Sequence, residues 1–303
     1  MKEEQTNTGP YHVYGILSAR IDAFLFSHHD FQKNQKFIKE CIKQRNTSVK
    51  YLGKYAFIRV CHAQEAVSSV FSFLSAISAG LSLIYILRMI KRQATKTYPH
   101  PAHLQYLATL KYTFCVHVAT WIFSGIFHIR DTYSTQCMDY FGAIASISST
   151  LVLSGNKLSI YPAAIRRILM LFGTAHVLYM HFVEFNFLYN SIVCGVLFGC
   201  NFALWSVWHK RASAHSYSKI LKLSMLGILV SAAFQVIDFG PVYFLLDSHA
   251  LWHILGWLFS TSLYVFLIVD AECMCSSKLH KIKQSSGLLG TNDRINTRQA
   301  DTI

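Results

Sequence analysis

The chain has 303 residues, of which 52% are apolar and only 14% are charged, and its formal net charge is +13. Soluble domains carry about a quarter charged residues, so this composition, with a mean hydropathy of +0.31, excludes an ordinary soluble protein. The basic residues form no stripe interleaved with aromatic residues, and we therefore expect no nucleic-acid binding.

The first 65 residues are mixed and polar, without the apolar stretch of a cleavable signal peptide. We interpret 1–65 as a short lumenal region ahead of the membrane domain. Asn46 opens an Asn-Thr-Ser triplet, which is a glycosylation acceptor on the lumenal side of a membrane. Cys41 and Cys61 would be able to pair in the same oxidising compartment.

Apolar runs dominate the rest of the chain, and each is long enough to cross about 30 Å of hydrocarbon as a helix. We expect spans at 66–87, 107–127, 138–156, 166–182, 187–207, 220–240 and 249–270. Only short polar loops separate these runs. The pattern therefore predicts that residues 66–270 form one all-α domain, a seven-transmembrane helical bundle. The remainder, 271–303, is polar and rich in Ser, Asn and Thr, and we expect a disordered tail.

The orientation of the bundle follows from the distribution of lysine and arginine. Basic residues gather in the first, third and fifth loops and in the tail: Arg88, Lys91, Arg92, Lys96, Lys157, Arg166, Arg167, Lys210, Arg211, Lys219, Lys278, Lys281 and Lys283. The even-numbered loops hold little beyond Arg130. The positive-inside rule then predicts a lumenal N-terminus and a cytoplasmic C-terminus.

The last apolar run opens with the sequence DSHALWH, which places His249 and His253 four residues apart. Asp247 or Ser248 would cap this helix at its N-terminus. Positions i and i+4 share one helix face with about 6 Å between Cβ atoms, a spacing at which two imidazoles can bind one ion. In the expected topology both histidines lie at the lumenal end of the helix.

A second pair of polar residues lies at the same level. The second span ends in WIFSGIFH, with Ser124 and His128 again four apart, and the third begins near Asp139. Three expected helices thus bring three histidines, a carboxylate and a hydroxyl to the lumenal membrane face. A lone histidine in a span is more often an interfacial or hydrogen-bonded residue, and we interpret His117, His176 and His181 in that way.

These residue types suit metal-dependent hydrolysis. Three imidazoles bind zinc and leave a fourth position for water, whose pKa falls to about 7. Asp139 would accept the proton as general base, and Ser124 would donate a hydrogen bond to the developing oxyanion. The level of the site, at the boundary between hydrocarbon and headgroups, fits the ester or amide linkage of a lipid.

The same pattern resembles the CREST superfamily of membrane hydrolases. The segments GKYAFIRVCHAQEAVSSVFSFL at 53–74, FHIRDTYSTQCMDYFGA at 127–143 and DFGPVYFLLDSHALWH at 238–253 resemble the Per1-like family within it, and the likeness extends over about 53–275. This family acts in GPI-anchor lipid remodelling. The resemblance implies that His128, His249 and His253 bind zinc and that Ser124 and Asp139 act in catalysis. Three further positions match the family and would support the site, although their role is not assigned: Arg130, Asp131 and Asp238.

The resemblance also implies a substrate and a compartment. The family is associated with a GPI-specific phospholipase A(2) activity, which removes the sn-2 acyl chain of the anchor in the ER or Golgi. This chain departs from the family pattern at Ala56 and Gly240, where family members usually have proline. Family members also have a cysteine-rich lumenal region, whereas the region is short here and holds only Cys41 and Cys61. The short lumenal region with its two cysteines concerns recognition of the protein-linked glycan more than the chemistry.

Two other functions are compatible with the sequence. A ceramidase-like lipid amidase would use the same five residues, and only its lipid products would distinguish it. A seven-helix receptor, or a non-enzymatic export factor for anchored proteins, would keep zinc as a structural ion and tolerate loss of Ser124. A retinal protein is disfavoured, since 249–270 has no lysine for a Schiff base.

Overall fold

The computed structural model describes residues 36–47, 50–51, 54–61, 63–96, 101–159, 163–213 and 215–276. Within these ranges the long helices are α2 (Ala66–Ala94), α3 (Pro101–Ile129), α4 (Tyr133–Lys157), α5 (Ala163–Phe182), α6 (Phe187–Arg211), α7 (Ser218–Ala233) and α8 (Ser248–Cys275). A short helical segment covers 36–44, and β1 (Lys50–Tyr51) pairs antiparallel with β2 (Lys54–Tyr55). The all-α class is confirmed for the described residues, with this small hairpin as the one addition.

Five of these helices, α2, α3, α4, α6 and α8, are long and apolar enough to cross a membrane. The chain is therefore an integral membrane protein. Helix α7 has 16 residues, which at 1.5 Å per residue is about 24 Å and shorter than the hydrocarbon layer. The count of seven spans and the orientation of the termini stay predictions.

The sixth expected span, 220–240, is wrong at its C-terminal end, because α7 stops at Ala233. The residues that follow find partners outside the helix: Gln235 contacts His249, and Asp238 pairs with Lys50. A proline at position 241 also opposes helical backbone in the residue before it. The last helix begins where expected but continues five residues beyond 270.

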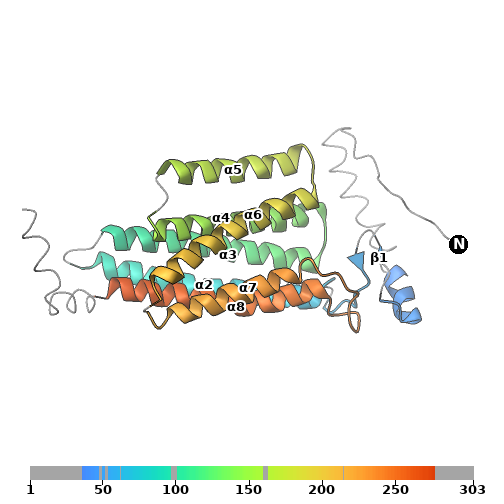
Figure 1. The fold of residues 1–303 in the computed structure, drawn as a ribbon. Coiled ribbons are helices and arrows are strands. Elements are labelled where there is room, and N and C mark those ends of the chain that lie inside the picture. Colours follow the sequence, from blue (N-terminus) through green and yellow to red (C-terminus); the bar gives the residue numbers. More distant parts are fainter. Residues whose placement is uncertain are drawn as a thin grey trace, which may run out of the picture.

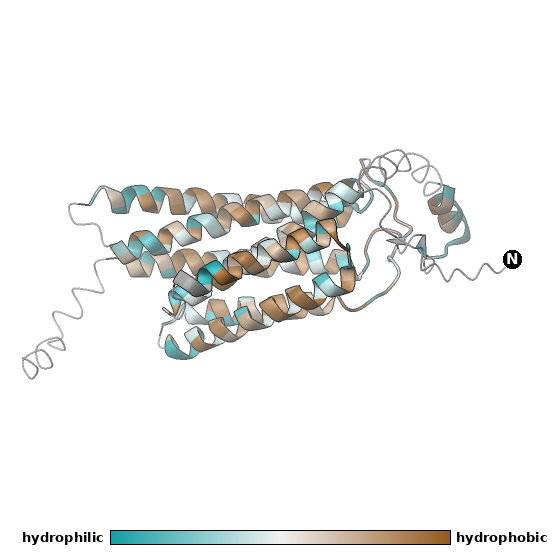
Figure 2. Ribbon diagram, turned by 90° about the horizontal axis from the view of Figure 1, so that it is seen from above, coloured by the Kyte–Doolittle hydropathy of each residue, from teal (hydrophilic) through white to brown (hydrophobic). Residues whose placement is uncertain are grey.

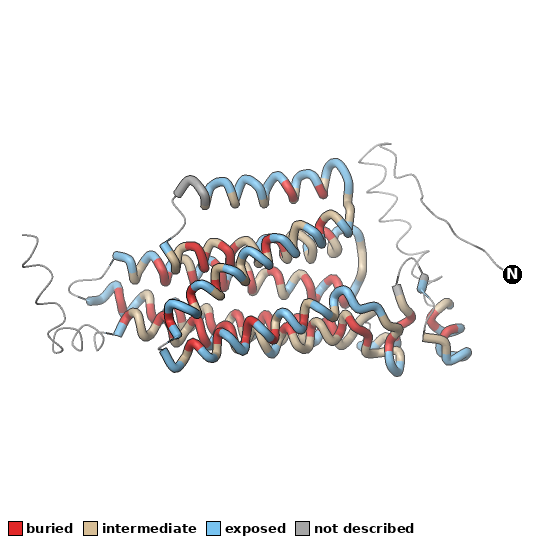
Figure 3. Tube along the Cα trace, in the orientation of Figure 1, coloured by how far each residue is buried: buried red, intermediate tan, exposed pale blue. Residues whose placement is uncertain are grey.

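The helices lie side by side along a common direction, with α5 set apart at the edge of the bundle (Figure 1). Apolar residues dominate the middle of the helices, and polar residues gather toward their ends (Figure 2). Buried positions concentrate where α2, α3, α4 and α8 face one another, whereas α5 is mostly exposed (Figure 3). The main core includes Leu107, Leu110, Phe114, Leu221, Phe266 and Leu267.

The residues before α2 pack onto the loop between α7 and α8. The amide of Ile58 donates to the carbonyl of Phe244 at 2.8 Å, and Phe244 packs against the small core formed by Ile38, Cys41 and Ala56. The backbone approaches closely at Gly240, where a Cβ atom would lie 2.4 Å from the carbonyl oxygen of Thr47.

An ion pair fixes the hairpin to the same loop. The Lys50 ammonium lies 2.6 Å from Asp238, and the Tyr55 hydroxyl donates to the same carboxylate at 2.9 Å; these hydrogen bonds lower the pKa of Asp238. Cys41 is buried, Cys61 is exposed and both are free thiols, so the disulfide considered from the sequence is not formed.

Candidate metal centre

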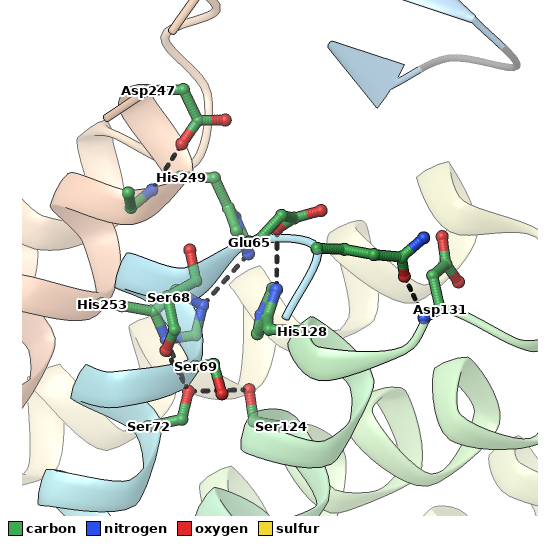
Figure 4. A network of polar contacts seen from close by, with 12 residues as sticks. Glu65, Ser68, Ser69, Ser72, Ser124, His128, Asp131, Asp247, His249 and His253 are labelled. Carbon is green, nitrogen blue, oxygen red and sulfur yellow. Dashed lines mark hydrogen bonds and ion pairs between the residues drawn. The ribbon is translucent and has the colours of Figure 1, made fainter. Parts of the chain in front are cut away.

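Three histidines from two helices converge at one end of the bundle (Figure 4). His128 lies in the last turn of α3, and His249 and His253 lie in the first two turns of α8. One ring nitrogen from each falls within 4.8 Å of the other two. His128 and His253 are buried and His249 is half-buried, so the cluster has little access to water.

The helix ends hold the histidines in place. The Asp247 carboxylate caps α8 by accepting from the amide of Ala250 at 2.7 Å, and burial raises the pKa of Asp247 to about 6. At the other helix, the amides of Gln64 and Glu65 donate to the last carbonyls of α3, those of Ile129 and His128, at 3.1 and 3.0 Å. The entry into α2 is thereby fastened to the end of α3.

Each of the three imidazoles has a hydrogen-bond partner at Nδ1. His128 Nδ1 lies 2.7 Å from Glu65 Oε2, and His249 Nδ1 lies 2.8 Å from Gln235 Oε1. A carboxylate oxygen and an amide oxygen can only accept, so in both rings Nδ1 carries the proton. Nε2 of each neutral ring is then a bare lone pair.

His253 reaches the same tautomer through a hydroxyl. Its Nδ1 lies 3.1 Å from Ser72 Oγ, while Ser72 Oγ donates to the carbonyl of Ser68 at 2.8 Å. A hydroxyl has one proton to donate, and the Ser68 carbonyl takes it. Ser72 therefore accepts from His253 Nδ1, which leaves His253 Nε2 bare.

This donor set fits a metal ion. His128 Nε2 is buried and has no hydrogen-bond partner among the described residues, and the Nε2 atoms of His249 and His253 are 3.1 Å apart. Two imidazole ligands of one tetrahedral zinc, each bonded at 2.0–2.1 Å, place their nitrogens about 3.3 Å apart. Metal-binding histidines typically donate their other N–H to a carboxylate, carbonyl or similar group, as all three do here.

Ser72 offers a direct check on this arrangement. Ser72→Ala should lower zinc affinity 10–100-fold, because His253 loses the acceptor that fixes its tautomer. The matched control is Ser75→Ala, because Ser75 is buried one turn further along α2 and its hydroxyl donates to the carbonyl of Phe71 in the same helix. Zinc titration of the two purified variants measures the difference, and equal affinities would contradict the assigned role of Ser72.

The two residues expected to act in catalysis, Ser124 and Asp139, do not belong to the histidine cluster. Ser124, one turn before His128, is buried, with its Oγ 3.4 Å from Ser72 Oγ. Asp139 is half-buried in the second turn of α4, which begins four residues after α3 ends. Nearby, the Thr120 hydroxyl donates to the Gly142 carbonyl at 2.9 Å and fixes this part of α4 against α3.

The three positions expected to support the site make contacts in the turn between α3 and α4 and in the hairpin. The amide of Asp131 donates to the Gln64 side chain, and the carbonyl of Arg130 accepts from Thr135 at 2.8 Å, which shapes the turn between α3 and α4. Asp238 is 60% exposed and pairs with Lys50. Its observed contacts bind the hairpin to the loop.

Among the residues that the structure describes, the other histidines do not belong to the cluster. His117 pairs through Nδ1 with the Tyr264 hydroxyl at 2.8 Å, and His176 pairs through Nε2 with Asn190 at 3.0 Å. Sequence reasoning missed the partners of the cluster itself: Glu65, Ser72 and Gln235. Glu65 stands directly before the first apolar run, at the end of the bundle expected to hold His128, and this placement was a usable signal.

Comparison with known proteins decides the family. The model of the Per1-like family matches residues 25–271. The chain belongs to the Per1-like family. This confirms the resemblance drawn from the motifs.

The relatives carry informative names. The chain is 30% identical over 241 residues to "GPI-specific phospholipase A2-like PGAP3" of Bos taurus, covering 76% of this chain and 71% of that protein. It is 31% identical over 221 residues to the protein of the same name from Xenopus tropicalis, covering 70% and 66%. The "Protein PER1 homolog" of Schizosaccharomyces pombe is 28% identical over 250 residues, covering 78% and 72%. No solved structure matches the chain.

Proposed function

We propose that this Per1-like protein is a zinc-dependent membrane hydrolase that removes the sn-2 acyl chain of GPI anchors. The observation that carries the metal-dependent part is the histidine cluster, in which each Nδ1 atom is hydrogen-bonded and one ring nitrogen of each histidine lies within 4.8 Å of the other two. The names of the relatives, "GPI-specific phospholipase A2-like PGAP3" above all, support the substrate and the reaction class.

The metal would be held by His128, His249 and His253. When bound, zinc supplies a Lewis acid that polarises an ester carbonyl and acidifies a water molecule. Glu65, Ser72 and Gln235 would orient the three imidazoles, because each accepts the Nδ1–H of one ring. The Glu65 carboxylate in addition makes His128 a stronger donor.

The remaining chemistry is ester hydrolysis by residues of this chain. In the proposal Asp139 takes a proton from the attacking water, whose oxygen bonds to the acyl carbon. Ser124 donates a hydrogen bond to the carbonyl oxygen as negative charge develops there. The bond from the acyl carbon to the glycerol oxygen then breaks, and the proton passes to that oxygen. The products are a free fatty acid and a lyso-GPI anchor.

The position of the site in the bundle suits a lipid ester. His128 lies in the last turn of one apolar helix, and His249 and His253 lie in the first two turns of another. This supports a site at the depth where hydrocarbon gives way to headgroups. The acyl esters of a glycerolipid occupy this boundary, whereas its chains lie deeper. We propose that this face is lumenal and that the protein acts in the ER or Golgi.

Protease protection in sealed microsomes tests the orientation. An N-terminal tag should be protected and a C-terminal tag digested, because the basic residues at the far ends of α2, α4 and α6 favour the cytoplasm. Asn46 should acquire a glycan unless it lies too near the membrane. The reverse pattern of digestion would place the histidines at the cytoplasmic face and contradict a lumenal function.

The lipid composition of anchored proteins tests the function in cells. Without the protein, GPI-anchored proteins should retain the unsaturated sn-2 chain that remodelling replaces, as measured by mass spectrometry of purified anchors. The wild-type chain should restore remodelling, and His253→Ala should not. Unaltered anchors in cells that lack the protein would refute the assignment of the substrate.

A further inference from the structure

A second polar site lies at the opposite end of the bundle from the histidines. Its centre is Asp270, 17 residues beyond His253 in α8 and so about 26 Å further along the helix. Asp270 is only 2% exposed. A buried carboxylate in a membrane helix is costly and marks a site that needs an explanation.

The charge of Asp270 is neutralised within the bundle. Lys157 at the end of α4 places Nζ 2.5 Å from Asp270 Oδ2. The hydroxyl of Tyr106 donates to the same oxygen at 2.8 Å, and the hydroxyl of Tyr217 donates to Oδ1 at 3.3 Å. Both carboxylate oxygens are thus engaged, and the Lys157 charge is matched by that of Asp270.

A pocket of about 460 Å³ opens beside this ion pair, between the ends of α4, α6 and α8 and the start of α7. Its walls include Trp208, Arg211, His215 and Tyr217. In the part of the chain that the structure describes, neither the Arg211 guanidinium nor the ring nitrogens of His215 make a hydrogen bond or an ion pair. The pocket therefore keeps an excess of positive charge.

The surroundings of the pocket point to a lipid headgroup. Trp208 and Tyr217 supply aromatic rings with polar edges, the residues enriched at the membrane–water interface. A second hollow at the same end of the bundle, of about 330 Å³, is lined by Arg88, Lys91 and Arg92. Arg92 pairs with Glu272 at 3.6 Å, and Arg88 and Lys91 extend the positive charge over this face. Basic pockets between transmembrane helices bind anionic lipid headgroups, and the planar guanidinium of arginine matches the oxygens of a phosphate.

We propose that this pocket binds the phosphate of an anionic phospholipid from the leaflet at that end of the helices, with Arg211 as the main ligand. The hydrocarbon chains of such a lipid would lie along the apolar surface of the neighbouring helices. The site shares no residue with the histidine cluster and does not depend on the proposed hydrolase function.

Native mass spectrometry of the full chain in a non-ionic detergent tests this site. Phosphatidylinositol 4-phosphate should bind in preference to phosphatidylcholine, and Arg211→Gln should weaken its binding about fivefold, the effect of one basic residue near an anionic surface. Arg211→Lys should retain part of the affinity, because it keeps the charge. The charge-matched control is Arg167→Gln, because Arg167 is an exposed residue of α5 at the same end of the bundle. This variant should bind the lipid as the wild type does.

Three results would overturn the proposal. Equal loss in Arg167→Gln would show that binding reflects surface charge rather than the pocket. Equal affinity for the two lipids would remove the preference for an anionic headgroup. Displacement of the lipid by millimolar inorganic phosphate would assign the pocket to a soluble phosphate ester. If Arg211→Gln does not fold, Arg211→Lys and Arg167→Gln carry the comparison.

Discussion

His253→Ala is expected to remove most of the zinc from purified protein, which should otherwise hold about one ion per chain. The substitution deletes one of the three imidazoles of the cluster, together with its hydrogen bond to Ser72. Stability should fall as well, since a ligand present at 100 times its Kd stabilises the folded state by about 2.7 kcal/mol. Metal analysis and thermal unfolding, with and without a chelator, measure the two effects.

The control for this variant is His176→Ala. His176 is as buried as His253, at 2% exposure, but hydrogen-bonds to Asn190 outside the cluster. It should therefore keep its zinc, and a chelator should destabilise it as much as the wild type. Full zinc occupancy in the double variant His249→Ala/His253→Ala would show that the ion, if any, binds elsewhere.

Asp139→Asn should keep the metal and lose the reaction. Asparagine has the shape of aspartate but cannot take a proton, and removal of a general base typically costs 10²–10⁴-fold in rate. Ser124→Ala should also retain zinc and lose about 10²–10³-fold, the effect of one oxyanion donor. Release of fatty acid from a GPI substrate, measured at equal zinc occupancy, gives both values.

Two variants separate chemistry from structure in this experiment. Asp238→Asn should leave activity near that of the wild type, because Asp238 is exposed and binds the hairpin. Ser75→Ala tests a buried hydroxyl of α2 that donates to a carbonyl of its own helix. Normal anchor remodelling by Asp139→Asn and Ser124→Ala at ordinary expression would mean that the protein acts as a scaffold, with zinc in a structural role.

The sequence was sufficient for the elements that depend on local pattern. Apolar runs of about 20 residues predicted where α2, α3 and α8 lie, since hydrocarbon thickness sets helix length. The boundaries were less accurate: α2 continues seven residues beyond 87, and α3 begins six residues before 107. The two i, i+4 pairs brought His128, His249 and His253 to one level, and the structure places their ring nitrogens together. Helical periodicity and alternating chain direction carry that information without knowledge of the packing.

Other features depend on contacts between distant segments. The partner of His128 is Glu65, 63 residues earlier, and that of His253 is Ser72, 181 residues earlier; no local pattern specifies such pairs. The end of α7 was missed for the same reason, because Gln235 and Asp238 leave the helix to reach His249 and Lys50. Asp139 was expected at the level of the histidines, but its distance from them depends on how α4 packs against α3.

Incubation of the purified zinc-loaded protein with a GPI-anchored substrate, followed by mass spectrometry of the lipid products, tests the central claim most directly. The wild type should release the sn-2 fatty acid and leave lyso-GPI, while His253→Ala and Asp139→Asn should release neither product above background. Ceramide offered in parallel should remain intact. Cleavage of ceramide with the anchor untouched, or equal product from wild type and His253→Ala, would contradict a zinc-dependent GPI acyl-ester hydrolase.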